Sequence, residues 1–507
     1  MGWRSWLLAL AGATSAPASA EWLQATSRHF VIYSDTNAAE LRALATKLEL
    51  FDGAIRRIHG MADPDDAAAN PVTLYVLRDA TAVQRLCGCP DVAGFYLPRA
   101  SGAVAFMPRR GDGTDSLALK PQTVLFHEYA HHFLLGNTEM AFPAWYSEGY
   151  AELVATADVQ PDAVEIGYAA NHRSFGLFAN HQLPLARLLA PPARLTDLEM
   201  DQLYGRGWLL THYLTFSQAR AGQLGRYLRS FAAGRPPLEA AAEAFGDLKA
   251  LDRELARYMR GKLPGLRIPA AALPSFPVEV RPLTPGERAL IDDRIVSTRG
   301  VDERTAAAVL ARARRAKVPA GDTVAQGWLA EMAFDAGQDD EAEAAADRAL
   351  AADPESVQAL MYKGQVRLRR ARTAKATDAK VWAEARSWFV KANRAHNNHP
   401  GALQGYHASF VLEGAKPTPN AVAGLHRALE LSPQSPDLRL AVAWSNLEAD
   451  RTKEARAVLA PLAYAPHAGQ DNEARRAIAL IDGGASGGTV IETLEKEAKA
   501  REAAEKK

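Results

Sequence analysis

The segment "FHEYAHHFL" at residues 126–134 places two histidines and a glutamate in an otherwise apolar run. In an α-helix, positions i and i+4 lie on one face, so His127 and His131 project together and could both bind one metal ion. Glu128 is rotated by one residue, close to such an ion but not on it. This H-E-x-x-H spacing predicts a site in which the two imidazoles bind Zn²⁺ and Glu128 accepts a proton from the attacking water. The alternative is a helix with partly exposed histidines, although polar groups in apolar surroundings are costly without a partner.

A second segment, "PAWYSEGYAEL" at residues 143–153, supplies a third candidate ligand, Glu148. Trp145, Glu148 and Gly149 resemble the second zinc helix of the gluzincin metallopeptidases, the thermolysin-like and aminopeptidase-like families. The resemblance implies a zincin-like fold in which Glu148 and the two histidines bind Zn²⁺ together. Three protein ligands leave a fourth position for water, which is typical of a catalytic zinc site rather than a structural one.

The same resemblance assigns roles to two further residues. Glu152 lies one turn after the third ligand, and its carboxylate is implied to accept the other ring N–H of a zinc-bound histidine. "YGRGWLLTHYL" resembles a Y-x-x-G-aromatic segment of the aminopeptidase-like gluzincins through Tyr204, Gly207 and Trp208. The Tyr204 hydroxyl is implied to donate to the oxyanion of the tetrahedral intermediate. A surface ion pair is the alternative for Glu152, and an aromatic ring packed on a core helix is the alternative for Tyr204.

The stretch "GAVAFMP" at residues 102–108 stands where aminopeptidases of this group carry a G-x-M-E-N strand. The glutamate of that strand holds the free amine of the substrate, and the present stretch has no acidic residue. It has strand character and could pair with an extended substrate backbone. We therefore expect an endopeptidase that cleaves internal bonds of a peptide or protein substrate.

The elements around these residues predict a multidomain chain. Residues 21–265 are expected to form an α+β, zincin-like metallopeptidase domain. "RHFVIYSD" and "PVTLYVLRD" have the composition of strands, so residues 21–120 should mix strands and helices. Residues 121–265 should be mainly helical and carry the zinc site. The Pro-rich start of residues 266–315 indicates a linker, followed by a helical connector.

Beyond this connector, "ALAADP", "AHNNHP" and "ALELSP" each place Ala five residues before Pro, at Pro354, Pro400 and Pro433. This pattern resembles the tetratricopeptide repeat (TPR) of ~34 residues, whose second helix ends in this way, with an insertion in the longer first interval. An all-α TPR solenoid is expected over residues 316–480, with a generic helical bundle as the alternative. Residues 481–507 are expected to be a flexible, charged tail.

The N-terminal segment "MGWRSWLLALAGATSAPASA" has one arginine, a short apolar stretch and small residues before a cleavage point after Ala20. This layout predicts a signal peptide over residues 1–20 and an exported protein, periplasmic or secreted. An uncleaved N-terminal helix is the alternative. No later segment approaches the ~20 apolar residues of a membrane span, so no integral membrane segment is expected after cleavage.

Cysteine content and charge add two smaller expectations. Cys87 and Cys89 are the only cysteines. A disulfide between them would be strained by the single intervening residue, and a zinc site would need more ligands, so we interpret them as small residues in a turn. Lys plus Arg and Asp plus Glu number 59 each, so no net charge directs the chain towards nucleic acid.

Together these features predict an exported, zinc-dependent endopeptidase whose TPR region binds a protein partner. The first alternative is a TPR-based binding scaffold with a structural or inactive zinc domain. The intact Glu128 argues against it, because a domain without activity has no need of the base. A non-peptidase hydrolase with the same zinc chemistry is the second alternative.

Overall fold

The computed structural model describes most of the chain after residue 20. The described residues are 21–65, 70–90, 92–110, 120–138, 140–178, 182–192, 194–465 and 472–505. The expected signal peptide, 1–20, lies outside them. Among the helices of these ranges, none is long and apolar enough to cross a membrane.

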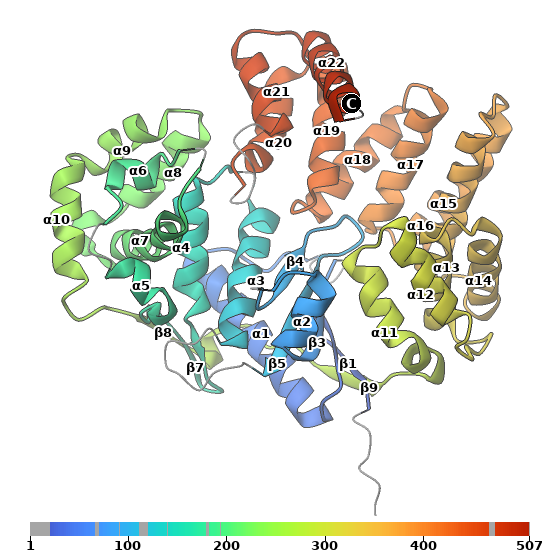
Figure 1. Cartoon of the computed structure of the whole chain (residues 1–507), viewed down its shortest axis with the longest axis horizontal. Helices are drawn as coiled ribbons and strands as arrows, with labels where there is room; N and C mark the ends of the chain where they lie inside the picture. Colours follow the sequence, from blue (N-terminus) through green and yellow to red (C-terminus); the bar gives the residue numbers. More distant parts are fainter. Residues whose placement is uncertain are drawn as a thin grey trace, which may run out of the picture.

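A mixed sheet lies at the centre of the molecule (Figure 1). Within the described residues it has six strands in the order β4-β5-β3-β2-β1-β9. Their bounds are β1 Leu23–Thr26, β2 Phe30–Ser34, β3 Val72–Asp79, β4 Phe95–Leu97, β5 Val104–Arg110 and β9 Glu279–Pro282. Strands β2, β3 and β5 are parallel, whereas β1 is antiparallel to β2 and β9, and β4 is antiparallel to β5.

The two faces of the sheet belong to two separate cores, because successive side chains of a strand point to opposite faces. Ile32 lies in one core, under α1 (Ala38–His59) and α3 (Pro121–Asn137). Its neighbour Tyr33 lies in the other core, together with Val83 of α2 (Ala80–Cys87) and Trp328.

Helices beside α3 form a lobe that covers the other side of this helix. Their bounds are α4 Ala144–Ala155, α5 Ser174–Leu177, α6 Leu185–Leu189, α7 Asp197–Phe216, α8 Gln223–Ala232, α9 Pro237–Phe245 and α10 Leu248–Tyr258. A smaller sheet, β6-β7-β8, flanks the lobe with strands β6 Asp158–Val159, β7 Ala163–Ile166 and β8 Leu266–Pro269. The zincin-like classification of this part stays a prediction.

The segment 266–315, expected to be a linker and connector, forms elements that belong to the sheets and their cover. Strand β8 pairs with β7, and β9 pairs with β1. Both are edge strands that end in proline, and proline is tolerated at a sheet edge because it has no N–H to donate. The helices α11 (Pro285–Arg299) and α12 (Glu303–Ala313) follow and contribute to the core around Tyr33.

Paired helices then form TPR-like repeats. Their bounds are α13 Thr323–Asp335, α14 Asp339–Ala352, α15 Val357–Thr373, α16 Ala379–Ala395, α17 Pro400–Glu413, α18 Pro419–Leu431, α19 Pro436–Glu448 and α20 Thr452–Ala463. Small residues allow close approach within and between the pairs, since Ala330, Ala346 and Ala349 are fully buried in one cluster. The repeat character predicted from the Ala-to-Pro spacing is therefore confirmed.

The chain ends in α21 (Glu473–Asp482) and α22 (Gly487–Glu505) rather than in the expected flexible tail. Val490 and Leu494 of α22 are buried in a cluster with α19 to α21. These two residues are four apart, so they lie on one face of the helix. This short apolar stripe is not evident from the charged composition of the segment.

Cys87 and Cys89 also differ from the expectation of two unpaired residues in a turn, because they form a disulfide. Gly88 between them has φ of 77°, a left-handed conformation that glycine adopts without strain. The resulting turn brings the two Cα atoms to 5.2 Å, within the usual range for a disulfide.

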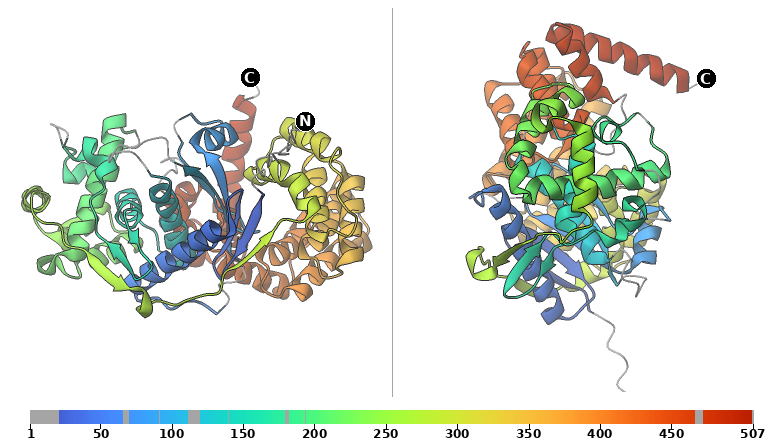
Figure 2. Two further views of the ribbon diagram at one scale, coloured as in Figure 1. Left: turned by 90° about the horizontal axis from the view of Figure 1, so that it is seen from below. Right: turned by 90° about the vertical axis from the view of Figure 1, so that its left-hand side faces the viewer.

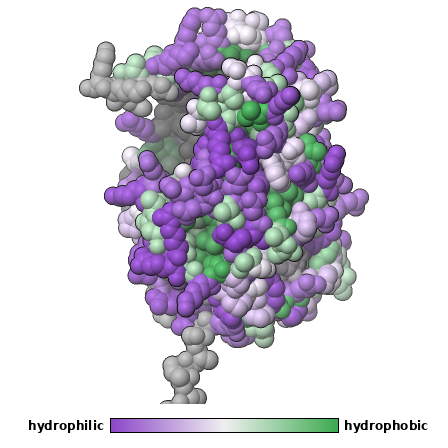
Figure 3. Space-filling model, turned by 90° about the vertical axis from the view of Figure 1, so that its right-hand side faces the viewer, coloured by the Kyte–Doolittle hydropathy of each residue, from purple (hydrophilic) through white to green (hydrophobic). Residues whose placement is uncertain are grey.

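The helical lobe and the solenoid flank the central sheet on opposite sides (Figure 2). The solenoid of α13 to α20 follows α11 and α12, which pack against the sheet, and curves until α19 and α20 lie above the end of α3 (Figure 1). Hydrophilic side chains predominate on its outer face, with smaller apolar areas between them (Figure 3).

Candidate metal centre

The candidate ligands lie on two helices that a third helix holds in place. Gly149 of α4 faces Gly207 of α7 so closely that a Cβ at Gly149 would lie 2.3 Å from the Gly207 carbonyl. A Cβ at Gly207 would lie 2.6 Å from the carbonyl oxygen of Trp145. Only glycine fits at both positions, and this contact brings Tyr204 of α7 towards the ligand-bearing face of α4.

Three donor groups converge between α3 and α4. The Nε2 atoms of His127 and His131 are 3.2 Å apart, and Oε2 of Glu148 lies 3.3 Å from the first and 3.6 Å from the second. One donor atom from each residue falls within 4.8 Å of the others. Glu148 is 1% exposed, whereas both histidines are partly accessible. The three residues predicted to bind metal are thus brought together, and the two histidines keep a small exposed fraction, 13% and 11%.

The other ring nitrogen of His127, on the side away from Glu148, is also in contact with a carboxylate. Its Nδ1 atom lies 3.4 Å from Oε1 of Glu152, the residue predicted to orient a ligand histidine. Glu152 is buried and is itself held by His172 at 2.6 Å and by Arg173 at 2.7 Å. These three contacts lower the pKa of Glu152 well below its usual value despite its burial, which acts in the opposite direction. The carboxylate is therefore charged and fixed.

The donor set fits a divalent cation such as Zn²⁺. Burial alone lowers the pKa of His127, but the hydrogen bonds and charges of Glu148 and Glu152 outweigh it and raise the pKa to about 10. His127 and His131 in turn hold the pKa of Glu148 below its usual range, although burial raises it. The site therefore favours positive charge between these side chains. Two imidazoles and one carboxylate, with a carboxylate behind one imidazole, are the ligand types and support that zinc prefers.

Glu128 lies on the accessible side of α3 and is partly buried. Burial raises the pKa of Tyr96 and of Tyr204, and the charge of Glu128 acts on both hydroxyls in the same direction. Neither an ion pair nor a hydrogen bond joins its carboxylate to another described residue.

Tyr204 borders the same site. Its ring centroid lies 6.1 Å from that of His127, and the Arg173 guanidinium lies 4.4 Å from its centre. Its pKa is raised above 10 by burial and by Glu148, so the hydroxyl stays protonated and can donate. His212 lies eight residues farther along α7 than Tyr204. Its ring contacts the Tyr258 hydroxyl at 2.8 Å and the Gly167 carbonyl at 3.0 Å.

The segment 102–108 is not positioned as expected. Its strand β5 pairs with β3 on one side, and on the other side β4 pairs with residues 104–106, so this part of the strand has no free edge for a substrate backbone. The edge strand is β4, which has no partner strand on its other side among the described residues. The Tyr96 hydroxyl of β4 lies 2.7 Å from Nδ1 of His132 on α3. This contact places the edge strand β4 beside α3.

Two residues of the site were not assigned from the sequence, His172 and Arg173. Both lie in the turn Asn171–Arg173 before α5, without helical or strand periodicity to indicate a direction. In the sequence, only their basic character could have indicated that they pair with the buried glutamates of α4.

Comparisons with known proteins add little to this geometry. No protein-family model matches the chain, and no curated protein sequence matches it. Among solved structures, it is similar to the crystal structure of a thermophilic TPR protein from Thermus thermophilus, with 23% identity over 38% of this chain and 97% of that chain and a TM-score of 0.31.

Proposed function

We propose that this chain is a zinc-dependent hydrolase that cleaves internal peptide bonds of a peptide or protein. The observation that carries the proposal is the convergence of His127, His131 and Glu148, with Glu128 accessible beside them. A bound Zn²⁺ would polarise the scissile carbonyl and lower the pKa of the attacking water.

The residues of the chain would perform the remaining tasks. Glu128 would accept the proton of the water and deliver it to the leaving amine. Tyr204 would donate to the developing oxyanion. Glu152, fixed by Arg173, would hold the His127 ring in the orientation for metal binding. The edge strand β4 would align the substrate backbone.

The test separates metal binding from chemistry. Purified protein should contain about one zinc per chain, as for a catalytic His₂Glu site. His127→Ala and Glu148→Ala should lose most of it, because each removes one of three ligands. Glu128→Gln should keep the metal but lose on the order of a hundredfold or more of its activity on an internally quenched peptide library, because an amide cannot accept the proton. A Gln variant as active as the parent would contradict the mechanism.

The proposed location is outside the cytoplasm, periplasmic or secreted. It rests on the layout of residues 1–20. Mass spectrometry of the mature N-terminus in an exporting host should find a chain that begins at Glu21.

A second candidate function, a protein-binding scaffold, is supported by a cavity between the sheet and the solenoid. Its volume is about 1000 Å³, and its walls come from the β4–β5 loop and from α11, α13, α15 and α17. The Arg99 guanidinium lines it and forms no hydrogen bond or ion pair with a described residue. A carboxylate-bearing segment of a protein partner would suit this cation.

Binding without catalysis would distinguish this candidate. In the Glu128→Gln background, fluorescent peptides with acidic residues should bind, and Arg99→Glu should abolish the binding. Arg288→Glu is the matched control, because Arg288 is an exposed arginine paired with Glu21 outside the cavity. Equal binding by both variants would exclude the cavity as the partner site.

A further inference from the structure

The predicted zinc helix α3 ends against the solenoid. Arg439 of α19 is 2% exposed, and its Nη2 atom lies 3.3 Å from the carbonyl oxygen of Leu135 and 3.5 Å from that of Thr138. These carbonyls belong to the last turn of α3 and its cap. The last carbonyls of a helix have no partner within the helix and carry its partial negative charge, so a guanidinium satisfies them well.

The same guanidinium is fixed from the solenoid side. Its Nε donates to the Pro433 carbonyl at 2.6 Å, and Nη1 lies 3.5 Å from the Val458 carbonyl. Pro433 lies in the turn before α19, and Val458 lies on α20. The planar fork of Arg439 therefore joins three elements, and its orientation is set before it reaches α3.

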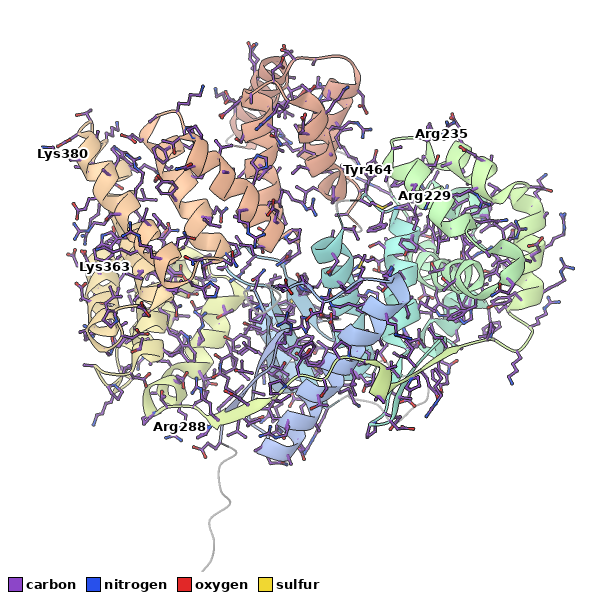
Figure 4. The ribbon with its side chains drawn as sticks, turned by 180° about the vertical axis from the view of Figure 1, so that it is seen from behind. Arg229, Arg235, Arg288, Lys363, Lys380 and Tyr464 are labelled. Atoms are coloured by element: carbon purple, nitrogen blue, oxygen red, sulfur yellow. A yellow bond between two sulfur atoms is a disulfide. The ribbon has the colours of Figure 1, made fainter. Side chains whose placement is uncertain are left out.

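Apolar contacts surround this polar connection. Ala141, which follows α3, and Phe231 of α8 lie in one buried cluster with Leu447 and Leu459 of the solenoid. The rings of Phe231 and Tyr464 are 5.1 Å apart. Figure 4 shows Tyr464 between the last repeats and the part of the lobe that carries Arg229 and Arg235. Arg439 is almost fully removed from solvent here, which strengthens the interaction of its charge with the helix end. A cavity of about 380 Å³ adjoins the guanidinium and the last turn of α3.

A shift of α3 along its axis would move His127 and His131 but not Glu148. His131 lies one helical turn before Leu135, so both residues move with the same segment of helix. Glu148 stays in place because the Gly149–Gly207 contact locks α4 onto α7. The distance between the two ligand-bearing helices therefore depends on what holds the end of α3.

We propose that Arg439 is a positioning residue for the metal centre. Through it, the last TPR-like repeats fix the position of the predicted zinc helix α3 along its axis, relative to α4. This inference rests on the proposed zinc function. It assigns to the solenoid a role in building the site, in addition to any role in partner binding.

The experiment measures Zn²⁺ affinity of the full-length chain by competition with a chromophoric chelator. Arg439→Ala should bind zinc about tenfold more weakly, the lower end of what loss of an outer support of a metal site costs. Arg439→Lys should fall between this variant and the parent, because it keeps the charge but not the fork. Hydrogen exchange of the metal-free chain should be faster at residues 131–138 in both variants.

Two controls separate positioning from general stability. Asn70→Ala removes a contact between the sheet and the solenoid, the bonds from Asn70 to the Leu431 carbonyl and the Ser432 hydroxyl. Arg456→Ala removes an ion pair with Asp482 at the place where α20 meets Gly234 of the lobe. Both should lower the melting temperature and leave zinc affinity unchanged.

The outcomes are distinct. Zinc affinity equal to the parent in both Arg439 variants, or a loss of the same size in Asn70→Ala, would overturn the inference while the proposed function stands. A parent that binds no zinc would overturn both. Should Arg439→Ala fail to fold, the Lys variant and its exchange rates decide the question.

Discussion

At the scale of single residues, the candidate centre is a set of charges that fix one another. Glu148 faces both histidines, Glu152 stands behind His127, and Arg173 neutralises Glu152. Arg173 also stacks on the Tyr204 ring. Each buried carboxylate therefore has a cationic or metal-ligating neighbour, which is the condition for keeping charge inside a protein.

The Tyr204 hydroxyl provides a test at this scale. Tyr204→Phe should leave the zinc content unchanged and lower kcat by about a hundredfold, because one donor to the oxyanion is lost. KM should change little, because the hydroxyl acts in the transition state. Tyr168→Phe is the control, since Tyr168 is exposed and bonded to Glu165. An unchanged kcat in the Tyr204 variant would reduce this residue to a packed aromatic.

At the scale of elements, the proposed peptidase would owe its specificity to the edge strand β4 and to the lack of a free carboxylate for a substrate amine. Neither Glu152 nor Glu165 is available to bind a substrate amine, since Arg173 contacts the first and Arg267 the second. In the proposed peptidase, a free N-terminal ammonium group bound at the site would therefore have neither of these carboxylates as a counter-charge.

The resulting prediction compares one peptide in two forms. Cleavage of an N-acetylated peptide should have a kcat/KM at least equal to that of its free-amine twin. Backbone pairing with β4 should contribute equally to both forms. A strong preference for the free amine would instead identify an exopeptidase, and the acidic residue responsible would have to be sought among residues outside this pair.

At the scale of the whole molecule, the solenoid packs against the rest of the chain at both of its ends. Its first helices cover one face of the sheet, where the Tyr33 and Trp328 rings are 6.2 Å apart. Its last helices pack on α3 and α8 through the cluster that contains Ala141 and Phe231. Both ends of the solenoid are therefore anchored on the part of the chain that carries the candidate site.

An excised solenoid should show the cost of losing these anchors. A fragment of residues 316–480 should be helical by circular dichroism, since neighbouring repeats bury each other's faces. It should nevertheless melt at a lower temperature than the full chain and bind a hydrophobic dye, because Trp328 and Met332, 3% and 1% exposed in the full chain, lose their cover. Equal melting temperatures would show that the repeats are independent of the sheet.

The sequence by itself determined features that depend on residues within a few turns of one another. The positions of His127 and His131 on one helix face, and of Glu148 and Glu152 on another, follow from helical geometry alone. The Ala-to-Pro spacing likewise indicated the repeats, because each repeat is specified locally and recurs.

Only the tertiary structure decided how distant elements meet. The approach of Gly149 to Gly207, the support of Glu152 by Arg173, and the contact of Arg439 with α3 each join segments that no periodicity connects. The same holds for the Pro-rich segment after residue 265, whose short stretches became strands because sheet edges were available to pair with them. Packing between elements far apart in the chain depends on the shapes of all the elements that share a core. The residue pattern within one element therefore does not specify its distant partner.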